Sequence, residues 1–475
     1  MYRQIDSEIL KRIEDVVGSQ NLLSRPEELE DYGHDETPGL SAAPEAAARP
    51  GTAGEISALV KLADRYRFPL LARGGGTGVT GGAVPVRGGL VVSLERMNRI
   101  REIDEKNMMA VAEAGVITED FHRAVEERGL FYPPDPASLD SCTLGGNLAE
   151  DAGGPRAVKY GVTRDYLTGV EAVLPNGQII EYGGKMVKNA TGYNLLHLLI
   201  GSEGTLGIAS RMVVRLLARP KIRVDLLVPF PAYRNAVESV AAILQRRLEP
   251  TAIEFMDRKC LEISRRVLQN PVPFDAAAAH LLIEVDGDDP ERVERRYQAI
   301  GELCLAGGAA DIRVADSPRY QEQLWETRRK LRDSIKTVSP VKASQDVVVP
   351  RMAIAELLAG IEQIEEKHGL EIISYGHAGD GNVHVNFLKR DREEGPWRKS
   401  LEKALPELFA LAVRLGGTIS GEHGIGVSKR KYLSLALNPS AISAMRSIKR
   451  ALDPNNILNP GKIFPSDERD KKSLA

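Results

Sequence analysis

The sequence predicts an α+β protein that folds into more than one domain. The chain has 475 residues, which is more than one hydrophobic core usually serves. Its first half places short apolar strands next to glycine-rich loops. Residues 220–316 then follow the order strand, helix, strand, strand, helix, strand, which is the split βαβ plan of ferredoxin-like domains. We therefore expect a glycine-loop domain followed by a second α/β domain.

The composition is that of an ordinary globular protein. Apolar residues make up 43% and charged residues 27% of the chain, and the net charge is −3. This charge gives no electrostatic case for nucleic acid or for an anionic membrane. No apolar run approaches the roughly 18 residues of a membrane span.

The N-terminus and the cysteines bear on the compartment. Residues 1–18 have apolar side chains at helical spacing and lack the apolar core of a signal peptide. Cys142, Cys260 and Cys304 lie far apart, which argues against a disulfide framework, an iron–sulfur cluster and a cysteine-based zinc site. We expect a cytoplasmic protein, which a partner subunit could hold at a membrane surface.

Local signals predict the elements of the first domain. Thr52 and Glu55 have capping-box spacing, and a helical apolar face follows them. Asn176-Gly177 predicts the turn of a hairpin. The expected strands and hairpin are at 69–72, 90–94, 109–116 and 170–182.

The first glycine loop, Arg73–Gly82, contains a G-x-G-x-x-G match. In a dinucleotide-binding Rossmann unit this loop would open a helix. Here Pro85 and further glycines forbid a helix, and a strand follows, which disfavours that interpretation. The loop can instead expose backbone N–H groups to an anion, with Arg73 adding charge, or it is a surface turn.

Two further glycine-rich stretches accompany the first loop. Residues 135–177 contain hydrogen-bonding side chains between glycines, and residues 189–208 end in another glycine-bracketed strand. Three such loops beside short strands indicate a long, extended ligand. In the second loop the candidate ligand-binding residues are Ser141, Thr143, Gly145, Gly146, Asn147, Gly153 and Gly154.

The motifs together resemble a known family. RGGGTGVTGG, CTLGGNLAEDAGG and GSEGTLGI are similar to the FAD-binding domain of the vanillyl-alcohol oxidase and p-cresol methylhydroxylase superfamily. GHAGDGNVH, SGEHGIG and DPNNILNPGK resemble its branch of FAD-linked 2-hydroxy-acid dehydrogenases, which includes the glycolate oxidase flavin subunit, D-lactate dehydrogenase and D-2-hydroxyglutarate dehydrogenase. The resemblance implies a two-subdomain FAD domain, an α/β cap, and a C-terminal segment that returns to the FAD domain.

The resemblance also implies the residues that bind FAD. No histidine lies between Arg73 and Gly82, where relatives with a covalent flavin often carry one, so we expect noncovalent FAD. The implied FAD-binding residues are Arg73, Gly74, Gly75, Gly76, Thr77, Gly78, Pro134, Asp135, Ser141, Thr143, Gly145, Asn147, Gly153, Gly154, Gly161, Ile208 and Asn459.

The C-terminal histidines have the arrangement of a metal site. Strand alternation puts His384 and Asn386 on one face, and the glycine turn before them can bring His377 back beside His384. Glu422 could add an oxygen ligand, with His423 pointing elsewhere. A capped or surface role for these histidines is the alternative.

The resemblance implies specific roles for these residues. His377, His384 and Glu422 would hold a divalent ion, either Zn, Mn or Fe, and His423 would be the catalytic base. The ion would act as a Lewis acid on the substrate hydroxyl, and His423 would accept its proton.

A substrate carboxylate requires a further anchor. The W-x-x-R pattern at Trp325 and Arg328 offers a planar guanidinium, although a solvated helix face would give the same pattern. Asn386 is a candidate substrate or ligand contact. Some members of the family that oxidise dicarboxylates carry a lysine before the aspartate of the following strand, and Lys342 is displaced from that position by two residues. Because of this displacement, we favour lactate or glycolate over 2-hydroxyglutarate as the substrate. Lys429 is a further candidate or a solvated lysine.

We therefore expect an FAD-dependent dehydrogenase that oxidises a D-2-hydroxy acid, with D-lactate or glycolate favoured. A D-2-hydroxyglutarate dehydrogenase, a metal-dependent hydrolase and a non-catalytic flavoprotein subunit are the alternatives. Electrons would pass to an iron–sulfur subunit, an electron-transferring flavoprotein or a quinone. The expected regions are an N-terminal arm at 1–45, an FAD domain at 46–220, a cap at 221–415, a C-terminal segment at 416–465 and a disordered tail at 466–475.

Overall fold

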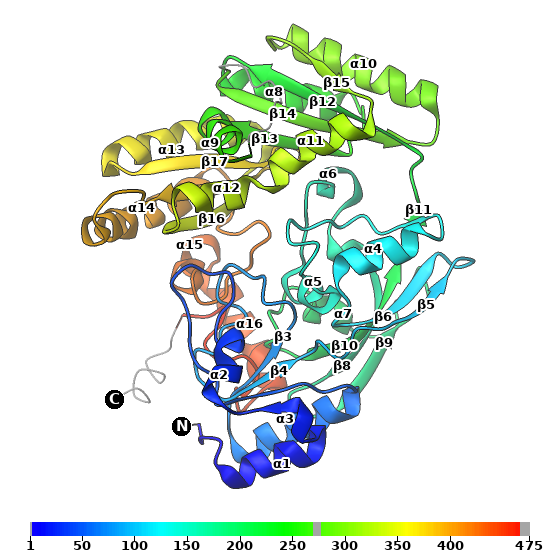
Figure 1. The fold of residues 1–475 in the computed structure, drawn as a ribbon, viewed down its shortest axis with the longest axis vertical. Coiled ribbons are helices and arrows are strands. Elements are labelled where there is room, and N and C mark those ends of the chain that lie inside the picture. Colours follow the sequence, from blue (N-terminus) through cyan, green and yellow to red (C-terminus); the bar gives the residue numbers. More distant parts are fainter. Residues whose placement is uncertain (1, 269–276, 466–475) are drawn as a thin grey trace. The chain divides into compact units, whose positions relative to one another are not determined.

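The computed structural model describes residues 2–268 and 277–465, so the expected tail lies outside the described residues. The chain forms two compact units (Figure 1). Unit 1 consists of Met1–Gly153, Val162–Arg219 and Glu422–Ala475, and unit 2 consists of Gly154–Gly161 and Pro220–Gly421. None of the described helices is both long enough and apolar enough to span a bilayer.

Unit 1 contains two main sheets in its described part. The first has the order β1-β2-β4-β3, and β4 runs parallel to both β2 and β3. The second is antiparallel and has the order β5-β6-β10-β8-β9. The strands are β1 (Leu22–Leu23), β2 (Ala46–Ala48), β3 (Leu70–Arg73), β4 (Leu90–Ser93), β5 (Ile100–Asp104), β6 (Met109–Glu113), β7 (Leu130–Phe131), β8 (Leu167–Val173), β9 (Ile179–Gly183), β10 (Ile208–Arg215) and β11 (Leu217–Ala218).

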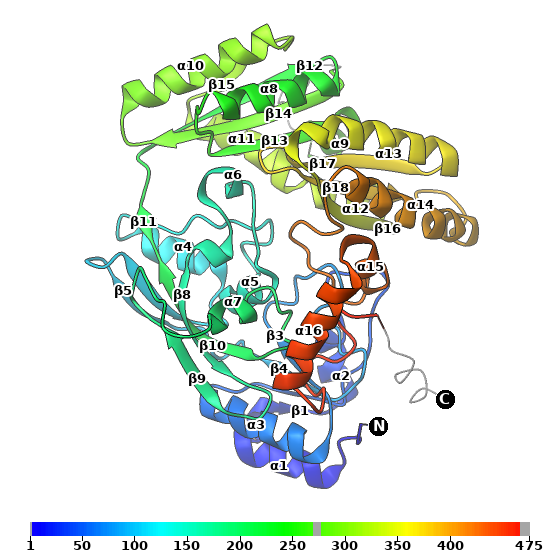
Figure 2. The same cartoon turned by 180° about the vertical axis from the view of Figure 1, so that it is seen from behind.

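The helices of unit 1 confirm the local signals. Thr52 caps α3 by accepting a hydrogen bond from the Glu55 amide, and the buried side chains of α1 recur at helical spacing. Figure 2 shows α15 and α16 in the same unit as β3 and β4. The helices are α1 (Ser7–Val17), α2 (Pro26–Leu29), α3 (Ala53–Tyr66), α4 (Thr118–Glu126), α5 (Leu144–Glu150), α7 (Leu195–Leu199), α15 (Leu433–Ala436) and α16 (Pro439–Leu452).

Unit 2 is built on a sheet with the order β15-β12-β14-β13-β17-β18-β16. The split βαβ pattern is present, but it extends into this larger sheet. The strands are β12 (Ile222–Phe230), β13 (Ala252–Asp257), β14 (Ala279–Gly287), β15 (Arg313–Ala315), β16 (Lys342–Val348), β17 (Glu371–His377) and β18 (Asn382–Leu388).

Helices cover the sheet of unit 2, and one of them was not predicted. The sequence-based prediction joined β13 to β14 directly, whereas Arg258–Leu268 between them is the helix α9. Its four arginine and lysine residues obscured an apolar face that buries Cys260, Leu261 and Ile263. The other helices are α6 (Ala157–Tyr160), α8 (Tyr233–Gln245), α10 (Pro290–Ala306), α11 (Pro318–Arg329), α12 (Leu331–Val338), α13 (Ile354–His368) and α14 (Glu394–Arg414).

One face of the unit 2 sheet is part apolar and part polar. Side chains from α9, α11 and α12 pack with Leu282, Met256 and Ile373 in one hydrophobic cluster. The same face carries His377, His384 and other polar side chains, because residues two apart on a strand share a face. The apolar cluster therefore packs beside His377, His384 and the other polar side chains on this face. The predicted α+β class is confirmed.

Candidate active site

The first two glycine loops of unit 1 pack directly against each other. A Cβ on Gly74 would collide with Thr143 Oγ1, and a Cβ on Gly75 would collide with the carbonyl oxygen of Ser141. Gly76 has φ +70, a conformation that favours glycine. Two loops about seventy residues apart in sequence are therefore held in contact by residues without side chains.

A cavity of about 440 Å³ lies at this contact. Its lining includes the predicted residues Arg73, Gly74, Gly75 and Thr143. Glycine backbone faces this space without side chains, which fits an anionic phosphate group. Sequence reasoning missed the other lining residues, although the ends of two predicted strands marked several of them: Asp31, Tyr32, Ser93, Glu95, Asn98, Ile100, Gly115, Val116, Ile117 and Asp120.

The side chain of Arg73 is already engaged inside the protein. Its guanidinium donates to the carbonyl oxygens of Asp31 at 2.8 Å and His34 at 2.7 Å. Burial lowers the pKa of Arg73. Arg73 thus orders the chain beside the cavity, and a contact of its charge with a phosphate stays a prediction.

The polar side chains of the second loop also hold the fold. Thr143 caps α5 by accepting from the Gly146 amide at 3.2 Å. Asn147 donates from Nδ2 to Thr118 Oγ1 at 2.8 Å. Ser141 Oγ donates to a carboxylate oxygen of Asp140 at 2.9 Å. These residues shape the loop, and their direct contact with a ligand stays a prediction.

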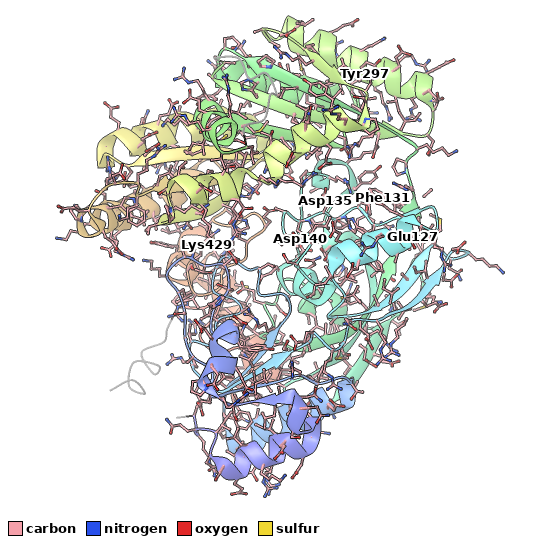
Figure 3. All side chains as sticks on the ribbon, viewed as in Figure 1. Glu127, Phe131, Asp135, Asp140, Tyr297 and Lys429 are labelled. Atoms are coloured by element: carbon pink, nitrogen blue, oxygen red, sulfur yellow. The ribbon has the colours of Figure 1, made fainter. Side chains whose placement is uncertain are left out.

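Other predicted FAD residues are dispersed over the structure. Pro134 and Asp135 lie on the loop after β7, where Figure 3 labels Asp135 and Asp140, and the Pro134 carbonyl oxygen lies 2.9 Å from His122 Nε2. Ile208 is buried at the start of β10. Gly154 and Gly161 delimit the short segment of unit 2 that contains α6.

Asn459 ties the C-terminal segment to the first glycine loop. Leu458 forms a parallel bridge with Leu70 of β3. The Asn459 side chain donates to the carbonyl oxygens of Gly82 at 3.0 Å and Glu203 at 2.8 Å. The predicted return of the C-terminal segment therefore has a structural basis within unit 1.

The segment that carries His423 is held by the first glycine loop. Thr80 Oγ1 donates to the His423 carbonyl oxygen at 3.1 Å, and the Thr80 carbonyl accepts from the Val427 amide at 2.8 Å. Glu422 Oε1 and His423 Nε2 are 3.5 Å apart. His423 is thus fixed through its backbone to the unit that contains the glycine loops.

A buried carboxylate supports the same segment. Glu203 accepts hydrogen bonds from the amides of Ile425 and Gly426, both at 2.8 Å. Burial raises the pKa of the Glu203 carboxyl, and the two amides lower it. Lys429 in the same segment, labelled in Figure 3, is only 2% exposed, so its interpretation as a solvated lysine is wrong.

In unit 2 the two predicted histidine ligands lie side by side. β17 and β18 are antiparallel, with Tyr375 opposite His384 and His377 opposite Asn382. The His377 and His384 rings have centroids 5.3 Å apart, and the side chains are 6% and 8% exposed. The predicted return of His377 to His384 across the glycine turn is confirmed.

Glu254, which sequence reasoning missed, connects His377 to Arg328. His377 Nδ1 lies 2.7 Å from Glu254 Oε1, and Arg328 Nη2 lies 2.5 Å from Glu254 Oε2. Arg328 is 6% exposed, so the solvated-face interpretation is wrong. The available signal was an acidic residue between Ile253 and Phe255 in an apolar strand.

The Tyr375 ring lies beside the arginine, and Asn386 lies on the same sheet face as Tyr375. The Arg328 guanidinium carbon is 4.9 Å from the centroid of the Tyr375 ring. Within the described residues neither its Nε nor its Nη2 makes a hydrogen bond, so its contact with Glu254 is an ion pair. Asn386 is 1% exposed and accepts from Ser344 Oγ at 2.7 Å. Trp325, three residues before Arg328, donates to Asp225 Oδ1 at 2.9 Å and so fixes α11 on the sheet.

Asp346 fixes the chain just before Glu422. Asp346 is on β16 and lies opposite His384 of β18. Its carboxylate accepts hydrogen bonds from the Gly421 amide at 2.6 Å and from Ser420 Oγ at 3.2 Å. A Cβ on Gly421 would collide with the side chain of Asn382. Gly421 ends unit 2, so Glu422 follows directly from a residue anchored beside the histidine strands.

Comparison with known proteins was decisive for the family. Residues 44–183 match the model of an FAD binding domain, and residues 219–463 match that of the C-terminal domain of FAD linked oxidases. The chain belongs to the FAD-linked oxidase family. The predicted resemblance is confirmed, and the cofactor class is FAD.

Relatives cover nearly the whole chain. Glycolate oxidase subunit GlcD of Bacillus subtilis is 41% identical, over 94% of this chain and 96% of the relative. D-Lactate dehydrogenase of Archaeoglobus fulgidus is 40% identical, over 91% and 95%. D-2-Hydroxyglutarate dehydrogenase of Stutzerimonas stutzeri is 32% identical, over 97% and 99%. This FAD-linked oxidase is an FAD-dependent oxidoreductase of that type, which rules out the hydrolase alternative.

The fold also matches solved structures. Substrate-bound p-cresol methylhydroxylase aligns with a TM-score of 0.81 at 20% identity, covering 96% of this chain and 97% of the other. 4-Ethylphenol oxidase from Gulosibacter chungangensis aligns with a TM-score of 0.78 at 20% identity, covering 97% of each chain. These matches confirm the predicted fold of this FAD-linked oxidase.

Proposed function

We propose that the protein oxidises a D-2-hydroxy acid to the 2-keto acid, with D-lactate or glycolate as the favoured substrate. The observation that carries this proposal is the row His377, His384 and Asn386 on one sheet face, with Arg328 lying over it. Relatives named glycolate oxidase subunit and D-lactate dehydrogenase, at 41% and 40% identity, support the substrate class.

The donor set fits a divalent metal ion. Two neighbouring imidazoles offer nitrogen ligands, and Glu422 follows the anchored Gly421 in the chain. His377 Nδ1 lies 2.7 Å from Glu254 Oε1, and a His377 tautomer that donates at this contact presents Nε2 to a metal. We propose His377, His384 and Glu422 as ligands of Zn, Mn or Fe, which would supply Lewis acidity when bound.

The remaining residues bind the substrate and move its proton. Arg328 presents a donor fork suited to a carboxylate, and Asn386 offers an amide to the same group. His423 accepts the hydroxyl proton, because an imidazole is the commonest general base in proteins. FAD, when bound, supplies N5 as the hydride acceptor. The roles of base and anchor therefore fall to different residues.

Lys342 favours D-2-hydroxyglutarate as a second candidate substrate. Because residues two apart on a strand share a face, Lys342 emerges on the same face as Ser344 and Asn386. Its side chain is 6% exposed, and burial lowers its pKa to about 8. A buried ammonium on this face could bind a second carboxylate, even though it is displaced by two positions in the sequence.

We also propose that the FAD is noncovalent and that its electrons pass to a partner. Acid precipitation should then leave the flavin in the supernatant. Cys142, Cys260 and Cys304 are all buried and unpaired, so they offer no ligand set for an iron–sulfur cluster. An iron–sulfur subunit, an electron-transferring flavoprotein or a quinone would accept the electrons.

Anaerobic flavin reduction tests the proposed function. D-Lactate or glycolate should bleach the absorbance of the bound flavin within seconds, L-lactate should not, and D-2-hydroxyglutarate tests the second candidate. Elemental analysis of the same sample measures the metal. Absence of bleaching by every 2-hydroxy acid would reject the proposal.

A further inference from the structure

Glu254 is a buried carboxylate shared by two functional side chains. It is 0% exposed and lies in β13, whose register places it opposite His377 of β17. Its Oε1 lies 2.7 Å from His377 Nδ1, and its Oε2 lies 2.5 Å from Arg328 Nη2. A single carboxylate thus contacts the proposed metal ligand and the proposed substrate anchor.

We propose that Glu254 is a positioning residue that couples metal binding at His377 to carboxylate binding at Arg328. This inference rests on the proposed function. Glu254 touches neither the substrate nor the metal, and it acts through the orientation of the two side chains that do. Its Oε1 is within hydrogen-bond distance of His377 and its Oε2 forms an ion pair with Arg328, so the orientation of both partners depends on its position.

The first half of the coupling concerns the imidazole. A carboxylate that accepts from Nδ1 fixes the tautomer and the rotation of the ring, so the Nε2 lone pair points away from Glu254. A carboxylate at this position also makes the imidazole a more basic ligand. Losing such a partner typically weakens metal affinity by about 10- to 100-fold.

The second half concerns the guanidinium. A buried charge is costly unless it is paired, and Glu254 supplies the opposite charge for Arg328. The Tyr375 ring supports the flat face of the guanidinium, 4.9 Å from its central carbon. With Nη2 paired to Glu254, Arg328 keeps Nε for a second acceptor, such as a substrate carboxylate.

Replacing Glu254 by glutamine tests the coupling. The variant Glu254→Gln keeps the size of the side chain but removes its charge and one of its acceptors. We expect about 10- to 100-fold weaker Mn²⁺ or Zn²⁺ binding, measured by competition with a chelator without substrate. We also expect a KM increase of at least tenfold, with kcat reduced less than KM is raised and FAD content unchanged.

Glu284→Gln is the matched control. Glu284 is an equally buried carboxylate on the neighbouring strand β14, and it lies near Arg156 and Arg223 at 3.9 and 3.6 Å. Its replacement should leave metal affinity within about twofold of the wild type. Glu254→Asp, which keeps the charge but shortens the side chain, serves if the glutamine variant does not fold, and it should weaken metal binding in the same direction.

A double mutant separates coupling from two independent effects. Arg328→Gln should raise KM strongly in the wild type and add little in the Glu254→Gln background. If the effects of the two substitutions on KM were fully additive, or if both Glu254 variants kept the metal affinity of the wild type, this inference would be wrong and the proposed function would still stand. A wild-type protein that bleaches with no 2-hydroxy acid and binds neither ion would instead overturn the proposed function and the inference with it.

Discussion

The two histidine-bearing motifs of this FAD-linked oxidase are built in opposite ways. His377 and His384 lie on adjacent strands of one sheet, and strand alternation and register position them. His423 lies on a segment without helix or strand, and Thr80 and Glu203 hold its backbone from more than 200 residues away. His377 and His384 are therefore positioned by local geometry, whereas the proposed base is positioned by distant contacts.

Close packing explains the glycines around His423. Gly424 and Gly426 have φ values of +74 and +50, and a Cβ on either residue would meet Glu150 or Thr80. Glycine is needed because the chain must pass close to other residues in a left-handed conformation. The turn between β17 and β18 has the same requirement at Gly381, which has φ +92 and whose Cβ would strike the Val349 carbonyl oxygen.

The largest effect is expected at His423 itself. His423→Ala should lower the rate of flavin reduction by about 10²- to 10⁴-fold, because His423 is the proposed acceptor of the hydroxyl proton. Stopped-flow absorbance of the bound flavin measures this rate. His197→Ala, at an exposed histidine of unit 1, is the control, and FAD content should be unchanged in both. A wild-type rate of flavin reduction in His423→Ala would show that His423 is not the base.

A smaller effect on turnover is expected from a substitution at Gly426, where the segment that carries His423 packs against Thr80. Gly426→Ala should lower turnover by about 10- to 100-fold and destabilise unit 1 by about 1–2 kcal/mol, since its Cβ would strike the Thr80 carbonyl at a left-handed φ. Steady-state kinetics and thermal unfolding measure the two effects.

Gly395→Ala is the matched control for that variant. Gly395 lies in α14, and a Cβ there would have no described neighbour within 4 Å. It should leave activity unchanged and stability equal or slightly higher. Equal losses in the two variants would contradict the idea that distant contacts position His423.

The smallest effect is expected at Lys342, on the sheet face that carries His377 and His384. Burial and Arg332 lower the pKa of Lys342 to about 8. The folded state therefore binds fewer protons than the unfolded state between about pH 8 and 10.5, so stability rises with pH across that window. Lys342→Met should remove this rise and stabilise unit 2 by about 1–2 kcal/mol at pH 7. Denaturant unfolding at pH 7 and 10 measures it, and an unchanged pH slope would contradict the argument.

The sequence predicted most of the proposed site residues, but not the residues that hold them in place. The hairpin of His377 and His384 follows from apolar alternation around a glycine turn, and the three glycine loops follow from residue type. Glu254 was not predicted, because a lone acid in an apolar strand does not reveal its partner. Helix α9 was missed because basic residues dilute its apolar face. Lys342 was discounted by sequence offset, although a shift of two on a strand keeps the same face.

By itself the sequence determined the fold family, the FAD-dependent chemistry and the residue types of the site. These properties are written in local patterns, namely glycine runs, strand alternation and spaced histidines. Only the tertiary structure decided that Glu254 joins His377 to Arg328 and that Glu203 and Thr80 hold the His423 segment. Such contacts join residues far apart in the chain, and no local periodicity specifies which distant side chains meet.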